Sequence, residues 1–307
     1  MKEEFILSDD TLRRIFQEKS LRQALVNLYL RQQGLSYPLL PETADLVPLH
    51  LACPRGKDFH LTPVGTSLGY NLLEYRNQVE EGRSNDILER MKIDQNSVLL
   101  DVGCGGGQTL LASLQFNPQK VVGFDRDGYA IALARFLFSQ KKVPPERYTF
   151  FHASLEPTGN YPPHLNPLPQ RGEGRVRVEF THIVCRVVLH KLKVRQTLSL
   201  FYHTLKPAGS LYLMVPSFSY YVSRLNLVFR NPLWSVYFLF VFVNGFVFAF
   251  FGWQMTLRLG SRTLSELFFT RRSLKRALQH NHFQTTEILF PSVPGKSSFL
   301  EVFARKC

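Results

Sequence analysis

The sequence has no closely spaced pair of cysteines, because Cys53, Cys104, Cys185 and Cys307 lie far apart in a chain of 307 residues. This spacing argues against a disulfide scaffold and a zinc site, so we expect reduced thiols and no metal ion. The first ten residues, MKEEFILSDD, carry four acidic groups and lack an apolar run of signal length. Secretion is therefore not expected, and these features favour a cytoplasmic protein.

Acidic residues are scarce in the last part of the chain. Residues 181–307 hold 16 Lys and Arg against Glu266, Glu287 and Glu301, so the whole net charge of +13 lies there. Such an excess favours a polyanionic partner, either nucleic acid or an anionic membrane surface, although a solvated basic face would have the same composition. The apolar fraction of 45% with 20% charged residues indicates a globular chain.

Charge is absent from LWSVYFLFVFVNGFVFAFFGW, residues 233–253, which has a Trp near each end. The run is long enough to cross a bilayer. Its centre, Asn244-Gly245, is a strong turn signal and predicts two halves joined by a turn. Three interpretations follow: a β-hairpin covered by a partner, a helical hairpin dipping into one leaflet, or helices forming a lid or dimer interface.

The membrane interpretation has support from the neighbouring sequence. A monotopic helical hairpin would have these anchors: Trp234, Trp253, Arg230, Arg258 and Arg262. The following helix carries a basic cluster suited to anionic headgroups, Arg271, Arg272, Lys275 and Arg276. We therefore expect an apolar small-molecule acceptor and contact with the inner face of the membrane.

Apolar runs of strand length alternate with helical patterns after Ser97, which predicts a parallel sheet covered by helices. Strands are expected at 97–103, 120–126, 147–154, 180–188 and 209–217, a helix at 263–281, and an antiparallel hairpin at 283–291 and 297–306. Helices are expected at 8–33, with Ser8 or Asp9 as the cap, and at 71–92. Residues 60–68 resemble the wing and following helix of winged-helix domains.

The strongest motif is VLLDVGCGGGQTL, residues 98–110, in which a buried strand ends in Asp101 and precedes Gly103, Gly105 and Gly107. Glycine suits a tight turn and a close approach of the backbone to a ligand. A dinucleotide fingerprint would need glycine at 108, where Gln108 stands. The carboxylate of Asp101, at the end of the strand, favours a ligand with an ammonium or sulfonium group over a pyrophosphate.

A second acid, Asp125, ends the next expected strand in VVGFDRD. There it is placed to accept hydrogen bonds from both hydroxyls of a ribose. The spacing between Asp101 and Asp125 fits one strand, one helix and one strand.

These motifs, with the CRVVLHKL segment and the terminal hairpin, resemble a class I S-adenosylmethionine-dependent methyltransferase of the type 11 kind. The resemblance implies S-adenosyl-L-methionine as cofactor and a doubly wound, mostly parallel seven-stranded sheet with a C-terminal antiparallel hairpin. It predicts a helical region at 1–94 and a methyltransferase domain at 95–307, with insertions at 157–178 and 218–260. It assigns cofactor binding to Asp101, Gly103, Gly105, Gly107, Asp125, Arg126, Ser154 and Cys185.

Two features depart from this pattern. The third strand of the family usually ends in an acid that bonds the adenine amino group, whereas this chain has Ala153 and Ser154. The insertion at 157–178, rich in Pro and Gly, resembles a translated intergenic repeat of bacterial genomes, which indicates a bacterial protein and no chemistry in the loop.

The catalytic residue stays unassigned, since His190, Tyr220 and Tyr221 are all near the expected site. Two other functions remain open: an RNA methyltransferase that uses the basic part, and a membrane adaptor that keeps the fold without catalysis. Aromatic residues are not interleaved with the basic ones, which makes nucleic acid the weaker partner.

Overall fold

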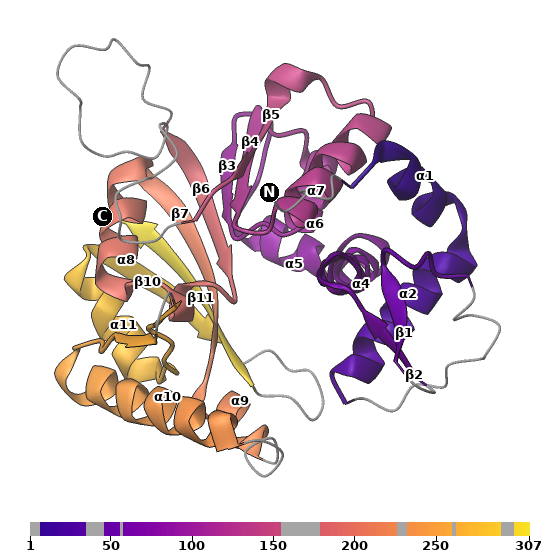
Figure 1. Cartoon of the computed structure of the whole chain (residues 1–307). Coiled ribbons are helices and arrows are strands. Elements are labelled where there is room, and N and C mark those ends of the chain that lie inside the picture. Colours follow the sequence, from indigo (N-terminus) through magenta and orange to yellow (C-terminus); the bar gives the residue numbers. More distant parts are fainter. Residues whose placement is uncertain are drawn as a thin grey trace, which may run out of the picture. The chain divides into compact units, whose positions relative to one another are not determined.

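The computed structural model describes residues 7–34, 46–55, 58–154, 179–225, 232–259, 262–289 and 298–307. The chain divides into two compact units, coloured along the sequence in Figure 1. Unit 1 comprises Met1–Arg90, Cys104–Asn117 and Val121–His152, and unit 2 comprises Met91–Gly103, Pro118–Lys120 and Ala153–Cys307. The predicted insertion at 157–178 lies outside the described residues, and the division at 94/95 stays a prediction.

Unit 1 begins with helices and a short hairpin. Its elements are α1 (Asp9–Gln17), α2 (Lys19–Gln32), the antiparallel strands β1 (Ala52–Arg55) and β2 (Asp58–Leu61), α4 (Pro63–Tyr75), a π-helix η1 (Arg76–Glu80), α5 (Arg83–Arg90), α6 (Gln108–Ser113), η2 (Leu114–Phe116), β4 (Lys120–Asp125), α7 (Gly128–Gln140), η3 (Pro145–Arg147) and β5 (Tyr148–His152).

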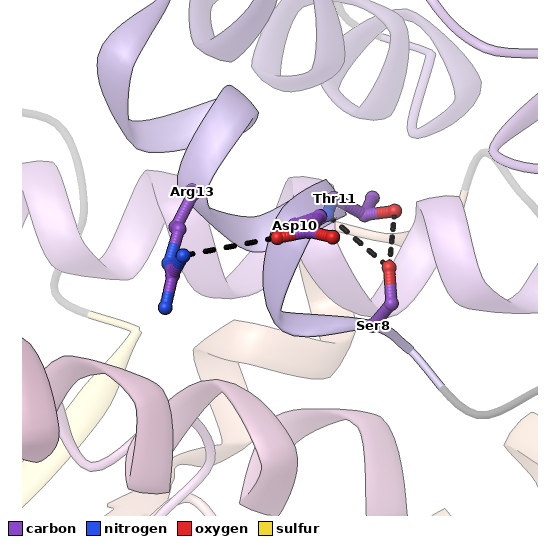
Figure 2. Close-up of polar contacts among 4 residues, drawn as sticks. All are labelled: Ser8, Asp10, Thr11 and Arg13. Atoms are coloured by element: carbon purple, nitrogen blue, oxygen red, sulfur yellow. Dashed lines mark hydrogen bonds and ion pairs between the residues drawn. The ribbon is translucent and has the colours of Figure 1, made fainter.

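The predicted helix over 8–33 is two helices, because Glu18 between them has an extended backbone. Ser8 is the cap: its hydroxyl oxygen accepts a hydrogen bond from the Thr11 backbone N–H at 3.3 Å, as Figure 2 shows beside the Asp10–Arg13 ion pair. The single helix predicted over 71–92 is wrong. It is divided into the end of α4, the π-helix and α5, with Gly82 in a left-handed conformation before α5.

Unit 2 holds the remaining strands and the apolar segment. Its elements are β3 (Val98–Val102), β6 (Phe180–Arg186), η5 (Leu189–Lys191), α8 (Val194–Thr204), β7 (Leu205–Pro216), α9 (Phe218–Val222), α10 (Pro232–Phe251), β8 (Leu257–Leu259), β9 (Arg262–Leu264), α11 (Arg271–His280), β10 (Phe283–Leu289) and β11 (Phe299–Lys306). In Figure 1 α10 lies along the outer edge of this unit.

Seven of the described strands form one sheet in the order β10-β11-β7-β6-β3-β4-β5. β3 pairs parallel with β6, β6 with β7, and β4 with β5, whereas β11 pairs antiparallel with both β7 and β10. The predicted fold class, a mostly parallel seven-stranded sheet with a C-terminal antiparallel hairpin, is confirmed. All five residues of β3 are buried, as expected of a strand covered on both faces.

The turn predicted at Asn244-Gly245 is wrong, and with it both hairpin interpretations, because residues 232–251 form one continuous helix. Asn244 is fully buried in that helix, and its side chain bonds a neighbouring loop. The Nδ2 group donates to the carbonyls of Glu266 (2.9 Å), Ser265 (3.2 Å) and Met255 (3.2 Å), and Oδ1 accepts the Met255 N–H at 2.7 Å. The amide therefore anchors the helix.

Gly245 has a packing role beside it. A Cβ at this position would lie 2.2 Å from Cδ1 of the Phe268 ring, which is itself buried. Phe268 belongs to a core cluster with Tyr221, Phe238 and Val241. Glycine thus lets the helix backbone approach the ring closely, at the cost of helix propensity.

The helix predicted over 263–281 is correct only in its second half. Thr263 pairs with Arg258 in the β8–β9 hairpin, and α11 begins after Thr270, which forms a reciprocal capping box with Ser273. Arg276, predicted to face lipid headgroups, donates to the carbonyls of Phe248, Ala249 and Phe250 at the end of α10. It therefore satisfies terminal carbonyls of that helix.

One helix in the described part of the chain is long and apolar enough to cross a membrane, by length and composition alone. It is α10, and 28% of its window Trp234–Phe251 is buried within the protein.

Candidate active site

The loop after β3 has the backbone that its glycines predict. Gly103, Gly105 and Gly107 all have positive φ angles, of 75°, 53° and 74°, a region that side chains with a Cβ rarely adopt. Gly103 is also closely packed, because a Cβ there would lie 2.2 Å from Cγ2 of Val188. Val187, which precedes Val188, has a φ of 55°, a strained conformation for a β-branched residue.

Asp125, at the end of β4, is joined to this loop. Its Oδ2 accepts the Gly105 N–H at 2.9 Å, and its Oδ1 accepts the Asp127 N–H at 2.9 Å. The side chain is only partly buried. Each carboxylate oxygen has two acceptor sites, so both can take a further hydrogen bond. The residue is thus suited to the predicted role of binding a diol such as ribose.

His152, which the sequence reasoning missed, lies beside the loop that follows β4. It ends β5 in register with Asp125. Its exposed ring packs against Gly128, and Nε2 donates to the carbonyl of Arg126 at 3.0 Å. The Arg126 side chain is exposed, and Ser154, two residues after β5, is half-buried. Only the strand register, invisible in a single sequence, brings His152 to this edge.

Asp101 and Cys185 lie on adjacent strands of unit 2. Val102 is in register with Cys185, and both Asp101 and Cys185 are buried. Burial raises the pKa of the Cys185 thiol, and the negative charge of Asp101 raises it further. Cys185 is therefore a neutral thiol at physiological pH, which suits contact with an apolar group and argues against a nucleophilic role.

A buried polar contact joins α4 to the glycine loop within unit 1. Asn71 Oδ1 accepts the Gly106 N–H at 2.7 Å, and Gln108 Nε2 donates to Oδ1 and to the backbone carbonyl of Asn71 at 3.1 and 2.8 Å. Asn71 and Gln108 are almost fully buried. No sequence motif marks Asn71, although the departure from glycine at 108 was the available signal.

Comparison with known proteins decides the family. Residues 75–288 match a family described as "Methyltransferase domain". The chain belongs to this methyltransferase-domain family. The predicted resemblance is thereby confirmed at the level of the family. No curated protein matches the chain.

Solved structures of methyltransferases also resemble the chain. One is an S-adenosylmethionine-dependent methyltransferase from Aquifex aeolicus, with 12% identity and a TM-score of 0.49, covering 78% of this chain and 98% of that one. Another, from Mesorhizobium loti, has 14% identity and a TM-score of 0.46, covering 74% and 99%. A third, from Clostridium acetobutylicum, has 11% identity and a TM-score of 0.46, covering 77% and 98%.

The candidate bases of this methyltransferase domain differ in protonation. Burial lowers the pKa of His190 well below its ordinary value, so its imidazole is neutral, and Nδ1 has no hydrogen-bond partner within the described residues. Burial raises the pKa of Tyr220 and Tyr221, which therefore keep their protons. Of the three, only His190 has an unprotonated side chain at neutral pH, and burial makes that imidazole a weak base.

Proposed function

We propose that the protein is an S-adenosylmethionine-dependent methyltransferase that acts on a lipophilic acceptor at a membrane surface. The observation that carries the enzymatic part is the bond between Gly105 and Asp125, which ties the glycine loop to the acid that ends β4. These groups fit the cofactor: the loop has the left-handed glycines that let a ligand approach the backbone, and Asp125 keeps acceptor capacity for two hydroxyls.

In this proposal the residues of the chain bind the cofactor and orient it. Asp125 holds the ribose hydroxyls, and the buried carboxylate of Asp101 favours the cationic end of the ligand. The bound cofactor supplies an electrophilic methyl group on a sulfonium. Because its leaving group is neutral, alignment of acceptor and methyl in a dry site supplies much of the rate enhancement. The buried imidazole of His190 is a weak base, which suits an acceptor that needs no prior loss of a proton.

Calorimetric titration of S-adenosylmethionine tests the enzymatic part. We expect micromolar binding by the wild type and at least a tenfold loss in Asp125→Ala. Asp86→Ala is the control, because Asp86 is an exposed carboxylate that pairs with Arg90 on α5. Absence of binding by folded wild-type protein would reject the enzyme and favour the non-catalytic adaptor.

The membrane part of the proposal rests on one face of α10. Successive exposed apolar side chains are spaced by three and four residues along it, and we call them the α10 stripe: Val236 (57%), Leu239 (66%), Val243 (44%), Phe246 (46%) and Phe250 (71%). The opposite face is buried against the protein, through Phe238, Val241 and Phe248. The helix therefore has two apolar faces, one buried and one largely exposed, although Phe246 at the edge of the stripe also packs against Phe268 and Phe218.

The uncharged flanks of the stripe favour lipid over a second protein. A soluble interface normally has a polar rim, whereas α10 carries no charged residue along its length. A span is incompatible with the sheet, since β7 before the helix and β11 after it are paired strands. A helix that lies in the plane of the membrane surface places its uncharged face in lipid without crossing the bilayer. Moving these half-exposed side chains into lipid is worth roughly 4–7 kcal/mol, on the scale of one reversible acyl anchor.

The chain contains a built-in probe for this interaction. Its two tryptophans, Trp234 and Trp253, are both exposed and lie at the two ends of the apolar segment. We expect their fluorescence to shift to shorter wavelength on vesicles that contain anionic phospholipid, and sedimentation to show binding. Leu239→Glu should weaken binding at least tenfold.

Leu49→Glu is the matched control, because Leu49 is equally exposed (73%) but lies outside α10. Equal binding by both variants, or no blue shift in the wild type, would contradict the membrane assignment. Sedimentation with neutral vesicles separates the apolar from the electrostatic contribution, since only the second depends on anionic lipid and salt.

A further inference from the structure

The contact between α4 and the glycine loop extends over two turns of helix. Beyond Asn71, Gln78 of the π-helix η1 accepts through its Oε1 from the hydroxyls of Thr109 (2.9 Å) and Ser84 (3.1 Å). Its Nε2 donates to the Glu74 carboxylate. Thr109, Ser84 and Gln78 are all buried. A row of amides on the N-terminal helices thus faces the start of α6.

The row consists of two neighbouring groups of hydrogen bonds, one around Asn71 and one around Gln78. Asn71 Nδ2 donates to the Ser67 carbonyl at 2.9 Å, while its Oδ1 serves Gly106 and Gln108. Buried amides are costly unless they are bonded in this way. The π-helix, a rare element that adds one residue to a turn, changes which side chains face α6, and Gln78 lies in it.

The network acts on a loop that needs outside support. Three left-handed glycines leave the segment 103–107 with high conformational freedom before binding. Asp125 fixes it at Gly105, and Asn71 fixes it at Gly106. A ligand that binds an already ordered loop avoids the entropy cost of ordering it.

We propose that Asn71 is a positioning residue for cofactor binding, with Gln108 as its partner, so that the N-terminal helices are a required part of the site. This inference rests on the proposed function. Asn71 acts through the shape of the loop, by holding the Gly106 amide, and has no role in the chemical step. Its loss is therefore expected to raise the cofactor KM while leaving kcat at saturating cofactor nearly unchanged.

Calorimetry with S-adenosylhomocysteine is the first test. Asn71→Ala should bind at least tenfold more weakly than the wild type, which corresponds to about 1.4 kcal/mol. The control is Asn281→Ala: Asn281 is also buried, and its Nδ2 makes the same kind of bond to the carbonyl four residues earlier (Ala277, 2.8 Å). Asn281 lies in unit 2, so its substitution removes this local bond and leaves the glycine loop untouched.

Further variants keep the proposal testable if Asn71→Ala does not fold. Gln108→Ala removes one arm of the contact and should weaken binding, with an effect that is not additive with Asn71→Ala. Amide exchange at Gly106 should speed up in Asn71→Ala and not in Asn281→Ala.

The outcomes separate this inference from the proposed function. Failure of the wild type to bind any S-adenosyl ligand refutes the proposed function. Wild-type binding with an unchanged affinity in Asn71→Ala and Gln108→Ala refutes the positioning role alone. Equal losses in Asn71→Ala and Asn281→Ala would also refute it, because they would trace to general destabilisation.

Discussion

The substitution Asn244→Asp tests the anchoring of α10 with a change of one group. The side chain keeps an oxygen that can accept the Met255 N–H, but the donor that faces the Ser265 and Glu266 carbonyls becomes a second oxygen. An ionised carboxylate there would be buried without a counter-charge and would repel those carbonyls. We expect the free energy of unfolding to fall by roughly 3–5 kcal/mol at pH 7.5.

The pH dependence makes this prediction specific. Burial among carbonyls raises the pKa of the new carboxyl above its ordinary value, and the protonated form can donate as the amide did. The folded state then binds a proton that the unfolded state has released, so stability relative to the wild type is regained as pH falls. Asn244→Ala leaves the same carbonyls unpaired but cannot titrate, so its deficit relative to the wild type should not change with pH.

Denaturant unfolding at pH 7.5 and pH 5.5, followed by circular dichroism, measures these differences. A deficit for Asn244→Asp that shrinks at pH 5.5, with a constant one for Asn244→Ala, is the expected pattern. Wild-type stability of Asn244→Asp at pH 7.5 would refute the reasoning, because it would mean that the amide donors do not hold the helix.

Other substitutions test separate contacts. Burial lowers the pKa of His190, so below pH 6.5 the unfolded chain binds a proton that the folded chain does not bind. This lowers the stability by an amount on the order of 1 kcal/mol at pH 5.5. His190→Leu should lose less stability between pH 8 and 5.5 than the wild type in urea titrations, and an equal loss would contradict the assignment. Gly245→Ala gains about 1 kcal/mol of helix propensity but must displace the Phe268 ring at a cost of roughly 1–3 kcal/mol. We expect Gly245→Ala to have a lower thermal midpoint than the wild type, and a higher midpoint would show that the Phe268 ring moves aside at little cost.

The parts of the fold that sequence could predict are those set by local pattern. The strands around Asp101 and Asp125 are short apolar runs bounded by turns, and the hairpin at the end of the chain needs no long-range information. The glycine loop was predicted for the same reason, since its positive φ angles are a property of the residues themselves.

The failures arise where distant residues override a local preference. Asn244-Gly245 is a turn signal in isolation, but Asn244 finds its partners at Met255, Ser265 and Glu266 and remains helical. Asn71 carries no signal because its role depends on Gly106, 35 positions later in the sequence. Tertiary partners of this kind cannot be seen in a pattern read over a single turn or strand.

The place of β11 in the sheet has a consequence for how the protein is made. β11 lies between β7 and β10, so the sheet of unit 2 stays open until this strand has left the ribosome. By then α10 has been outside for a few seconds, at about 5–20 residues per second. Early in that interval the buried face of α10 lacks Phe268 and Phe269, which follow the helix in the chain. A membrane or a chaperone that takes hold of the nascent helix would do so before folding is complete.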